Sequence, residues 1–143
     1  MNKKQLISQY IASQILGVIA TVNQDNNPQA ALVALTEVDT LGLIFGTYNT
    51  SRKYRNILKN PHIAVVFGNS PEEAITVQYE GIAEELSGVE LERCRTLHIA
   101  KNPRSAKYAD KPEQRYFKIK PTWIRYVDLA SNPNIEFEVT EFH

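Results

Sequence analysis

Residues 45–68 read FGTYNTSRKYRNILKNPHIAVVFG, and this stretch decides the fold and carries the first clue to function. No acidic residue occurs between Asp39 and Glu72, although the whole chain balances 16 basic against 16 acidic side chains. The interval carries five basic side chains: Arg52, Lys53, Arg55, Lys59 and His62. Apolar runs flank a hydroxyl-rich turn and a short helical pattern. The stretch therefore predicts a strand, a helix and a strand, with positive charge where the helix begins.

The start of this helix has the chemistry of an anion site. A helix N-terminus offers free backbone N–H groups and a favourable dipole, and hydroxyl and basic side chains add directed hydrogen bonds. Such groups fall within one turn at Thr47, Thr50, Ser51, Arg52 and Lys53. The spacing fits two interpretations, a phosphate site or a capped surface helix with solvated basic residues. The helix ends at Asn60-Pro61, because the residue before proline avoids helical backbone angles.

Hydrophobic periodicity predicts the other elements on both sides of this stretch. Amphipathic helices are expected over residues 3–16 and 89–101, with a short helix or loop from there to residue 110. Strands are expected at residues 18–22, 30–35, 41–47, 63–67, 75–86, 116–119, 123–127 and 135–139. Gly81 marks a bulge or bend, and Asn69–Pro71 a turn. Many short strands with few helices predict a mainly β, α+β fold, an antiparallel barrel with flanking helices.

Length, composition and net charge indicate the general class of protein. A length of 143 residues predicts one domain over residues 1–143, and 43% apolar with 22% charged residues is typical of a globular protein. A net charge of zero argues against a nucleic-acid or membrane partner. The apolar run 15–22 is too short to span a bilayer. The single cysteine, Cys94, excludes an internal disulfide, and a cytoplasmic location is expected.

Some single residues admit two roles. His98 is expected to be a partly buried structural histidine, and a catalytic or haem-ligand role is the alternative. Trp123 is expected to pack in the core, and a place across a dimer interface is the alternative. Arg104, Lys107 and Tyr108 are interpreted as a solvated loop rather than a ligand contact. No histidines and carboxylates have metal-ligand spacing, so no metal site is expected.

The order of motifs resembles the FMN-binding split-barrel family typified by pyridoxamine 5′-phosphate oxidase. The segment FGTYNTSRKYRNILKNPHIAVVF, residues 45–67, is followed by ITVQYEGIAEELS, residues 75–87. In that family an aromatic-Thr-Asn strand end leads into Ser-Arg-Lys, then Asn-Pro and an apolar strand. The opening hairpin GVIATVNQDNNPQAALV, residues 17–33, is also similar to the family's first strands. The resemblance covers about residues 15–127.

The resemblance implies a six-stranded antiparallel Greek-key split β-barrel with flanking helices. It also implies a homodimer with two FMN sites at its interface, and a small-molecule substrate. Arg52 and Lys53 would bind the FMN phosphate beside Ser51, and Gly46 and Thr47 would lie near the ribityl chain and ring. Backbone groups of Leu32 and Val33 would meet the polar edge of the ring. Thr76, which replaces a family glutamine, is the remaining expected cofactor-binding residue. The resemblance names no catalytic side chain.

The chain departs from the oxidase at its substrate site. The oxidase has an arginine near Ala31, a substrate-phosphate lysine near Thr36 and a tryptophan near Val127, and its terminal Arg-Leu segment has no counterpart in IEFEVTEFH. These losses argue against pyridoxamine phosphate oxidation. The leading hypothesis is an FMN-dependent oxidoreductase. The alternatives are a non-catalytic flavin-binding or stress-related protein, a barrel that uses F420 or haem, and, least favoured by the net charge, a nucleic-acid-binding barrel.

Overall fold

The structure of the chain is a computed structural model that describes residues 1–68 and 72–142, so the turn expected at residues 69–71 lies outside the described residues. The helices within these ranges are α1 (Lys3–Ala12), α2 (Arg52–Lys59), α3 (Gly88–Lys101), the 3₁₀ helix η1 (Pro103–Ser105) and α4 (Ala106–Ala109). The strands are β1 (Leu16–Val22), β2 (Pro28–Ala34), β3 (Thr36–Val38), β4 (Gly42–Tyr48), β5 (His62–Phe67), β6 (Ile75–Glu85), β7 (Gln114–Asp128) and β8 (Ile135–Val139). In these described ranges no helix is both long and apolar enough to cross a membrane.

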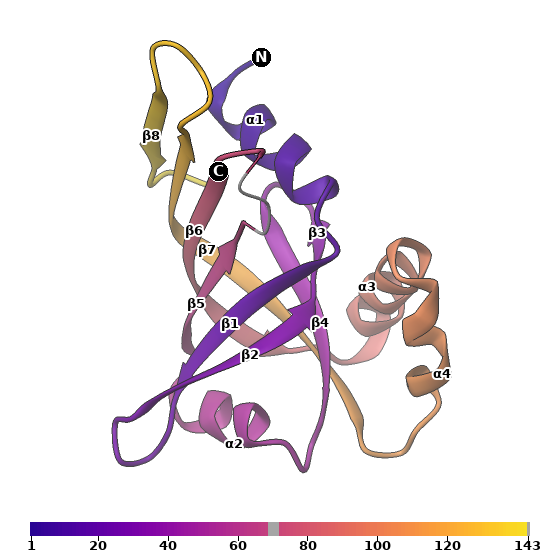
Figure 1. The fold of residues 1–143 in the computed structure, drawn as a ribbon. Coiled ribbons are helices and arrows are strands. Elements are labelled where there is room, and N and C mark those ends of the chain that lie inside the picture. The colour runs from indigo at the N-terminus through magenta and orange to yellow at the C-terminus, as the bar shows by residue number, and fades with distance from the viewer. Residues whose placement is uncertain (69–71, 143) are drawn as a thin grey trace.

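The strands form one antiparallel sheet that curls into a half-barrel (Figure 1). Its main path is β2-β1-β5-β6-β7-β4, and β2 and β4 at the two ends of this path lie in contact without being neighbours in the sheet. The sequence predicts these six strands and the barrel class correctly. The described part of the chain adds the short β3, which pairs with β4, whereas β8, which pairs with β7, confirms the strand expected at residues 135–139. The three residues of β3 are too few to show a period in the sequence.

Two boundaries differ from the sequence prediction. The first helix ends at Ala12 rather than residue 16, because Ser13 caps it and Leu16 already begins β1. The strands predicted at 116–119 and 123–127 are one strand, β7, which continues through Pro121. Pro121 lies opposite Gly81, where the β6–β7 register shifts. A proline has no N–H to donate, so an irregular point in a ladder tolerates it. The bulge expected at Gly81 is confirmed.

We expect Gly81→Ala to lower the free energy of unfolding by about 1–3 kcal/mol, in the range of an overpacked interior. A Cβ at this position would lie 2.5 Å from the carbonyl oxygen of Lys120 and 2.7 Å from Cγ2 of Ile119. The first of these atoms is backbone, which cannot move aside as a side chain does. Urea denaturation checks the value, with the exposed Glu84→Ala on the same strand as control. Equal midpoints for the two variants would contradict the steric account.

The barrel interior contains the main hydrophobic core. Strand residues alternate inward and outward, and the inward set of β5 (Ile63, Val65, Phe67) is buried, whereas Ala64 and Val66 are exposed. Phe45 is fully buried and stacks on Phe117, with ring centroids 5.4 Å apart. Burial of these side chains supplies most of the folding free energy. The core thus fixes where β4 leaves the barrel and where α2 begins.

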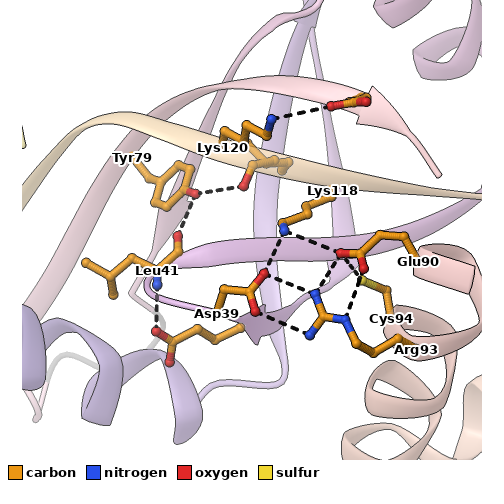
Figure 2. A network of polar contacts seen from close by, with 11 residues as sticks. Asp39, Leu41, Tyr79, Glu90, Arg93, Cys94, Lys118 and Lys120 are labelled. Atoms are coloured by element: carbon orange, nitrogen blue, oxygen red, sulfur yellow. Dashed lines mark hydrogen bonds and ion pairs between the residues drawn. The ribbon is translucent and has the colours of Figure 1, made fainter. Parts of the chain in front are cut away.

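Helix α3 is held beside the barrel by an ion-pair cluster (Figure 2). Arg93 of α3 donates to both carboxylate oxygens of Asp39 at 3.2 and 3.1 Å, and Lys118 of β7 lies 2.6 Å from Asp39. Glu90 contacts Arg93 at 2.6 Å and Lys118 at 3.5 Å. Arg93 and Lys118 hold the pKa of Glu90 down, at about 2. Since these residues come from the β3–β4 turn, α3 and β7, the cluster ties α3 to the strand that carries the site.

Candidate cofactor site

The turn between β4 and α2 is built by side-chain capping. The Ser51 hydroxyl accepts a 3.2 Å hydrogen bond from the backbone N–H of Tyr54 and lies 2.8 Å from the Thr47 hydroxyl. A hydroxyl cap was expected at Thr50 or Ser51, and these contacts show that Ser51 is the N-cap. They also fix the direction in which α2 leaves the strand. The side chains of Arg52 and Lys53 follow directly, so their positions are set by the turn.

Lys53 lies where two cavities meet. A small cavity of about 110 Å³ lies between β1, β2 and the start of α2, and Arg52 and Lys53 line it together with Ala31. A larger one of about 520 Å³ also includes Lys53 in its lining. Lys53 is half-buried, and this burial lowers its pKa. Within residues 1–68 and 72–142, no carboxylate pairs with Lys53 or Arg52. A partly buried, unpaired cation suits an anionic ligand.

The larger cavity lies against β2 and β4 and collects most of the expected site residues. Six of the eight line it: Leu32, Val33, Gly46, Thr47, Ser51 and Lys53. Arg52 lines the adjoining small cavity. Thr76 lines neither cavity: it is exposed on β6 opposite Val127. The structure therefore joins seven of the eight positions around two adjoining cavities.

A glycine keeps one wall of the larger cavity open. Gly46 pairs across the ladder with Tyr116, and Tyr48 pairs with Gln114. A Cβ on Gly46 would lie 2.4 Å from Nε2 of Gln114 and 3.0 Å from Cε1 of Tyr116. The absence of a side chain lets both β7 side chains lie over the β4 backbone. A larger residue at this position would push Gln114 and Tyr116 away from the strand and into the cavity.

The side of the cavity next to α3 and α4 has residues that the sequence did not predict as a site. These are Tyr48, His98, Ser105, Tyr108, Gln114 and Tyr116. Tyr48 and Tyr108 meet edge to face at 6.3 Å between centroids. Tyr108 is exposed, as expected, but lies in the short helix α4 and also lines the cavity. The sequence could have indicated that Gln114 and Tyr116 lie together, because residues two apart on a strand share a face.

A buried hydrogen-bond network surrounds His98. Its Nδ1 lies 2.8 Å from the Thr36 hydroxyl, which also accepts a 3.4 Å hydrogen bond from the Asn102 amide. His98 is only 3% exposed, and burial, with Lys101 nearby, lowers its pKa to about 4. The imidazole is therefore neutral at pH 7. Thr36, near which the oxidase has its substrate-phosphate lysine, is used here to hold His98.

We expect the protein to lose stability as the pH falls from about 6.5 to 4. The pKa of His98 is lower in the folded chain than in the unfolded chain, so the unfolded chain binds the extra proton in this window. The stability is complete above the unfolded pKa and falls by up to about 3 kcal/mol as the pH drops through the folded pKa. Urea midpoints at pH 7 and 4.5 measure this loss, and His98→Gln should reduce the difference between them. An equal pH dependence of stability in the parent protein and in His98→Gln would contradict the assignment of this loss to His98.

Other single-residue expectations have mixed outcomes. His98 is confirmed as a buried residue with structural hydrogen bonds, although it also lines the cavity. Trp123 is not among the buried core residues, so the core prediction is wrong. It lies on the opposite face of β7 from the buried Ile124 and lines a groove with Val18 and Val66. Among the described residues there is no cluster of three potential metal ligands.

The curled sheet defines a split-barrel protein, and two adjoining cavities meet at Lys53. The sequence pattern of the family described as pyridoxamine 5′-phosphate oxidase matches residues 4–128. The chain therefore belongs to this family. Its relatives include the pyridoxine/pyridoxamine 5′-phosphate oxidase of Thermosynechococcus vestitus, 42% identical over 72 residues, which are 50% of this chain and 34% of the relative. The chain spans well under half the length of the curated relatives it matches.

Solved structures give the same fold at low sequence identity. A haem binding protein from Mycobacterium smegmatis superposes with a TM-score of 0.82 and 18% identity, covering 98% of this chain and 59% of that protein. General Stress Protein 26 from Bacillus anthracis gives a TM-score of 0.74 and 22% identity, covering 97% of this chain and the whole of that protein. Identities this low support the fold alone. Ligand and activity must be argued from this chain's own residues.

Proposed function

We propose that the chain binds FMN and acts as a flavin-dependent oxidoreductase on a small molecule. The observation that carries the proposal is Lys53, a half-buried cation without a carboxylate partner among the described residues, placed where a small cavity meets a large one. A phosphate fits the small cavity, where Arg52 adds a second charge. A flat ring system fits the larger cavity, whose wall at Gly46 is formed by the Gln114 and Tyr116 side chains.

The residues present fit the flavin in size and in chemistry. A site for a small molecule needs an apolar slot with a few fixed polar groups, and Leu32, Val33 and Tyr116 supply apolar wall in the larger cavity. The Thr47 and Ser51 hydroxyls, 2.8 Å apart, line the larger cavity together with Lys53. When bound, FMN supplies hydride chemistry at its ring, while this chain positions the cofactor and excludes water. No acid or base side chain is assigned.

The visible spectrum of freshly purified protein, followed by mass spectrometry of the extracted cofactor, tests the proposal. We expect the absorption bands of an oxidised flavin and the mass of FMN. Protein that is colourless and that takes up no added FMN in a titration would overturn it. Turnover is tested separately, by reoxidation kinetics with a nicotinamide donor and an acceptor. Bound FMN without turnover would favour a flavin carrier, sensor or stress-related protein.

Haem is a second candidate, favoured by one observation. His98 is neutral, is held at Nδ1 by Thr36 and lines the larger cavity, and a neutral imidazole is the form that binds a metal. The structurally similar Mycobacterium smegmatis protein is described as haem binding. The same spectrum separates the two candidates, because haem gives an intense Soret band that a flavin lacks. The mass spectrum also tests F420.

We further propose a homodimer with the cofactor sites at its interface. The larger cavity is open on one side, and Leu32 in its wall is 64% exposed. Val66, 41% exposed, lies with Val18 and Trp123 in an apolar groove of about 340 Å³ on the outer face of the sheet. A second copy would cover such surface. Light scattering during gel filtration is expected to give twice the chain mass, and a monomer with bound FMN at micromolar concentration would contradict the dimer.

A cytoplasmic location stays a prediction from the sequence.

A further inference from the structure

A pair of polar groups in the larger cavity lacks normal hydrogen-bond partners. The Tyr116 side chain is 3% exposed, and its buried hydroxyl has no hydrogen-bond partner within the described chain. Burial raises the pKa of Tyr116; the charge of Arg95 and the neighbouring Gln114 amide oppose this rise, and Asp110 adds to it. The Gln114 amide itself makes one long hydrogen bond, 3.4 Å to the Arg115 carbonyl. A buried hydroxyl without a partner costs stability, so a ligand that supplies an acceptor would recover it.

The two groups are presented together. Gln114 and Tyr116 are two residues apart on β7, so their side chains share one face of the sheet. Both lie over Gly46, whose Cβ would clash with each of them. A phenol hydroxyl and an amide N–H₂ on one face are both donors. They match the two lone pairs of a single carbonyl oxygen.

The surrounding charges favour an uncharged ligand. Among the described residues that line the larger cavity, Lys53 is the one with a fixed positive charge, and it also lines the small cavity assigned to the phosphate. His98 stands near Tyr116, with ring centroids 6.1 Å apart, and is neutral. Outside the lining, Arg95 and Asp110 act on Tyr116 with opposite effects on its pKa, and Arg95 is already paired with Glu92. A carboxylate or phosphate at this end would therefore lose its hydration without gaining an unpaired cation. Tyr48 and Tyr108 offer aromatic surface instead.

We propose that Gln114 and Tyr116 form a recognition subsite for the carbonyl group of a neutral, planar molecule. This inference rests on the proposed function, because it assigns the substrate class of the same cavity. It separates the two ends of the cavity by charge: the end at Lys53 takes the anionic part of the cofactor, and the end at Tyr116 takes an uncharged carbonyl compound. It accounts for the departure at Thr36, since a lysine there would serve a phosphorylated substrate.

Benzamide and benzoate are suitable probes, because they share shape and differ in charge. Their dissociation constants are measured by ligand-observed NMR on the protein, both as purified and after saturation with FMN. We expect benzamide to bind at least tenfold more tightly than benzoate. Tyr116→Phe should weaken benzamide about fivefold, the effect of one neutral hydrogen bond. Tyr126→Phe removes a hydroxyl from the same strand away from the cavity and should leave benzamide binding unchanged.

The outcomes distinguish this inference from the proposed function. A separate FMN titration of the parent protein reports on the flavin site alone, and absence of FMN binding there would overturn the proposed function whatever the benzamide result. Benzoate binding as tightly as benzamide, or benzamide binding unchanged in Tyr116→Phe, would overturn the subsite. If Tyr116→Phe weakens FMN instead of benzamide, the pair holds the cofactor, and the subsite is likewise overturned.

Discussion

Lys53→Glu is expected to reduce FMN affinity by roughly 100-fold or more while the chain remains folded. A hydrogen bond to a charged group contributes about 1.5–3 kcal/mol, each 1.4 kcal/mol is a factor of ten, and the reversed charge adds repulsion. Folding should change little, because the side chain is half-buried and makes no ion pair with any described residue. Quenching of flavin fluorescence during titration measures the affinity, and circular dichroism with a urea curve measures the fold.

The control for this variant is the same charge reversal at Lys120. That side chain is 67% exposed and makes only a 3.7 Å contact with Glu84, and such surface pairs contribute little. Lys120→Glu should bind FMN as the parent protein does, apart from the small effect of net charge. The phosphate would lie elsewhere if Lys53→Glu bound FMN with the parent's affinity. Lys53→Gln should fall between the two, because it removes the charge without repulsion.

The sequence predicts the site best where local chemistry decides the structure. The Ser51 cap, the end of α2 at Asn60 and the bulge at Gly81 all follow from neighbours in the chain, and each is confirmed. Six expected residues around the larger cavity were placed by the resemblance, which contains tertiary information that spacing lacks. Thr76 is the exception, since it lines neither cavity in the described chain and its role stays a prediction.

The part that the sequence missed depends on contacts between distant segments. Gln114 and Tyr116 become site residues only because β7 pairs with β4, more than 60 positions earlier, and places them over Gly46. His98 reaches the cavity because Arg93 and Asp39 hold α3 against the barrel. Pro121 indicates a strand break in the sequence, but β7 continues through it because the register shift at Gly81 accommodates a proline. Pairing register is a property of the folded sheet and cannot be read from either strand alone.

Phe45→Ala is expected to lower the free energy of unfolding by about 3–5 kcal/mol, the range for removing a buried aromatic side chain. Phe45 is fully buried and stacks on Phe117, which also meets Tyr54 of α2 at 5.7 Å between centroids. The cavity left behind would have rigid walls on both sides. Urea denaturation measures the loss, and Leu58→Ala, at a position that is 60% exposed, should change stability by less than about 0.5 kcal/mol.

Phe45→Ala and Lys53→Glu together test whether one stretch of sequence has two separable roles. Phe45 contacts the core, whereas Lys53 lines the cavities eight positions later. Phe45→Ala should therefore retain FMN affinity at temperatures where it is folded, and Lys53→Glu should retain stability without the cofactor. FMN would raise the melting temperature of Phe45→Ala, because a ligand that binds only the folded state stabilises it by mass action. If Phe45→Ala were as stable as Leu58→Ala, the aromatic stack would not organise the barrel around the β4–α2 turn.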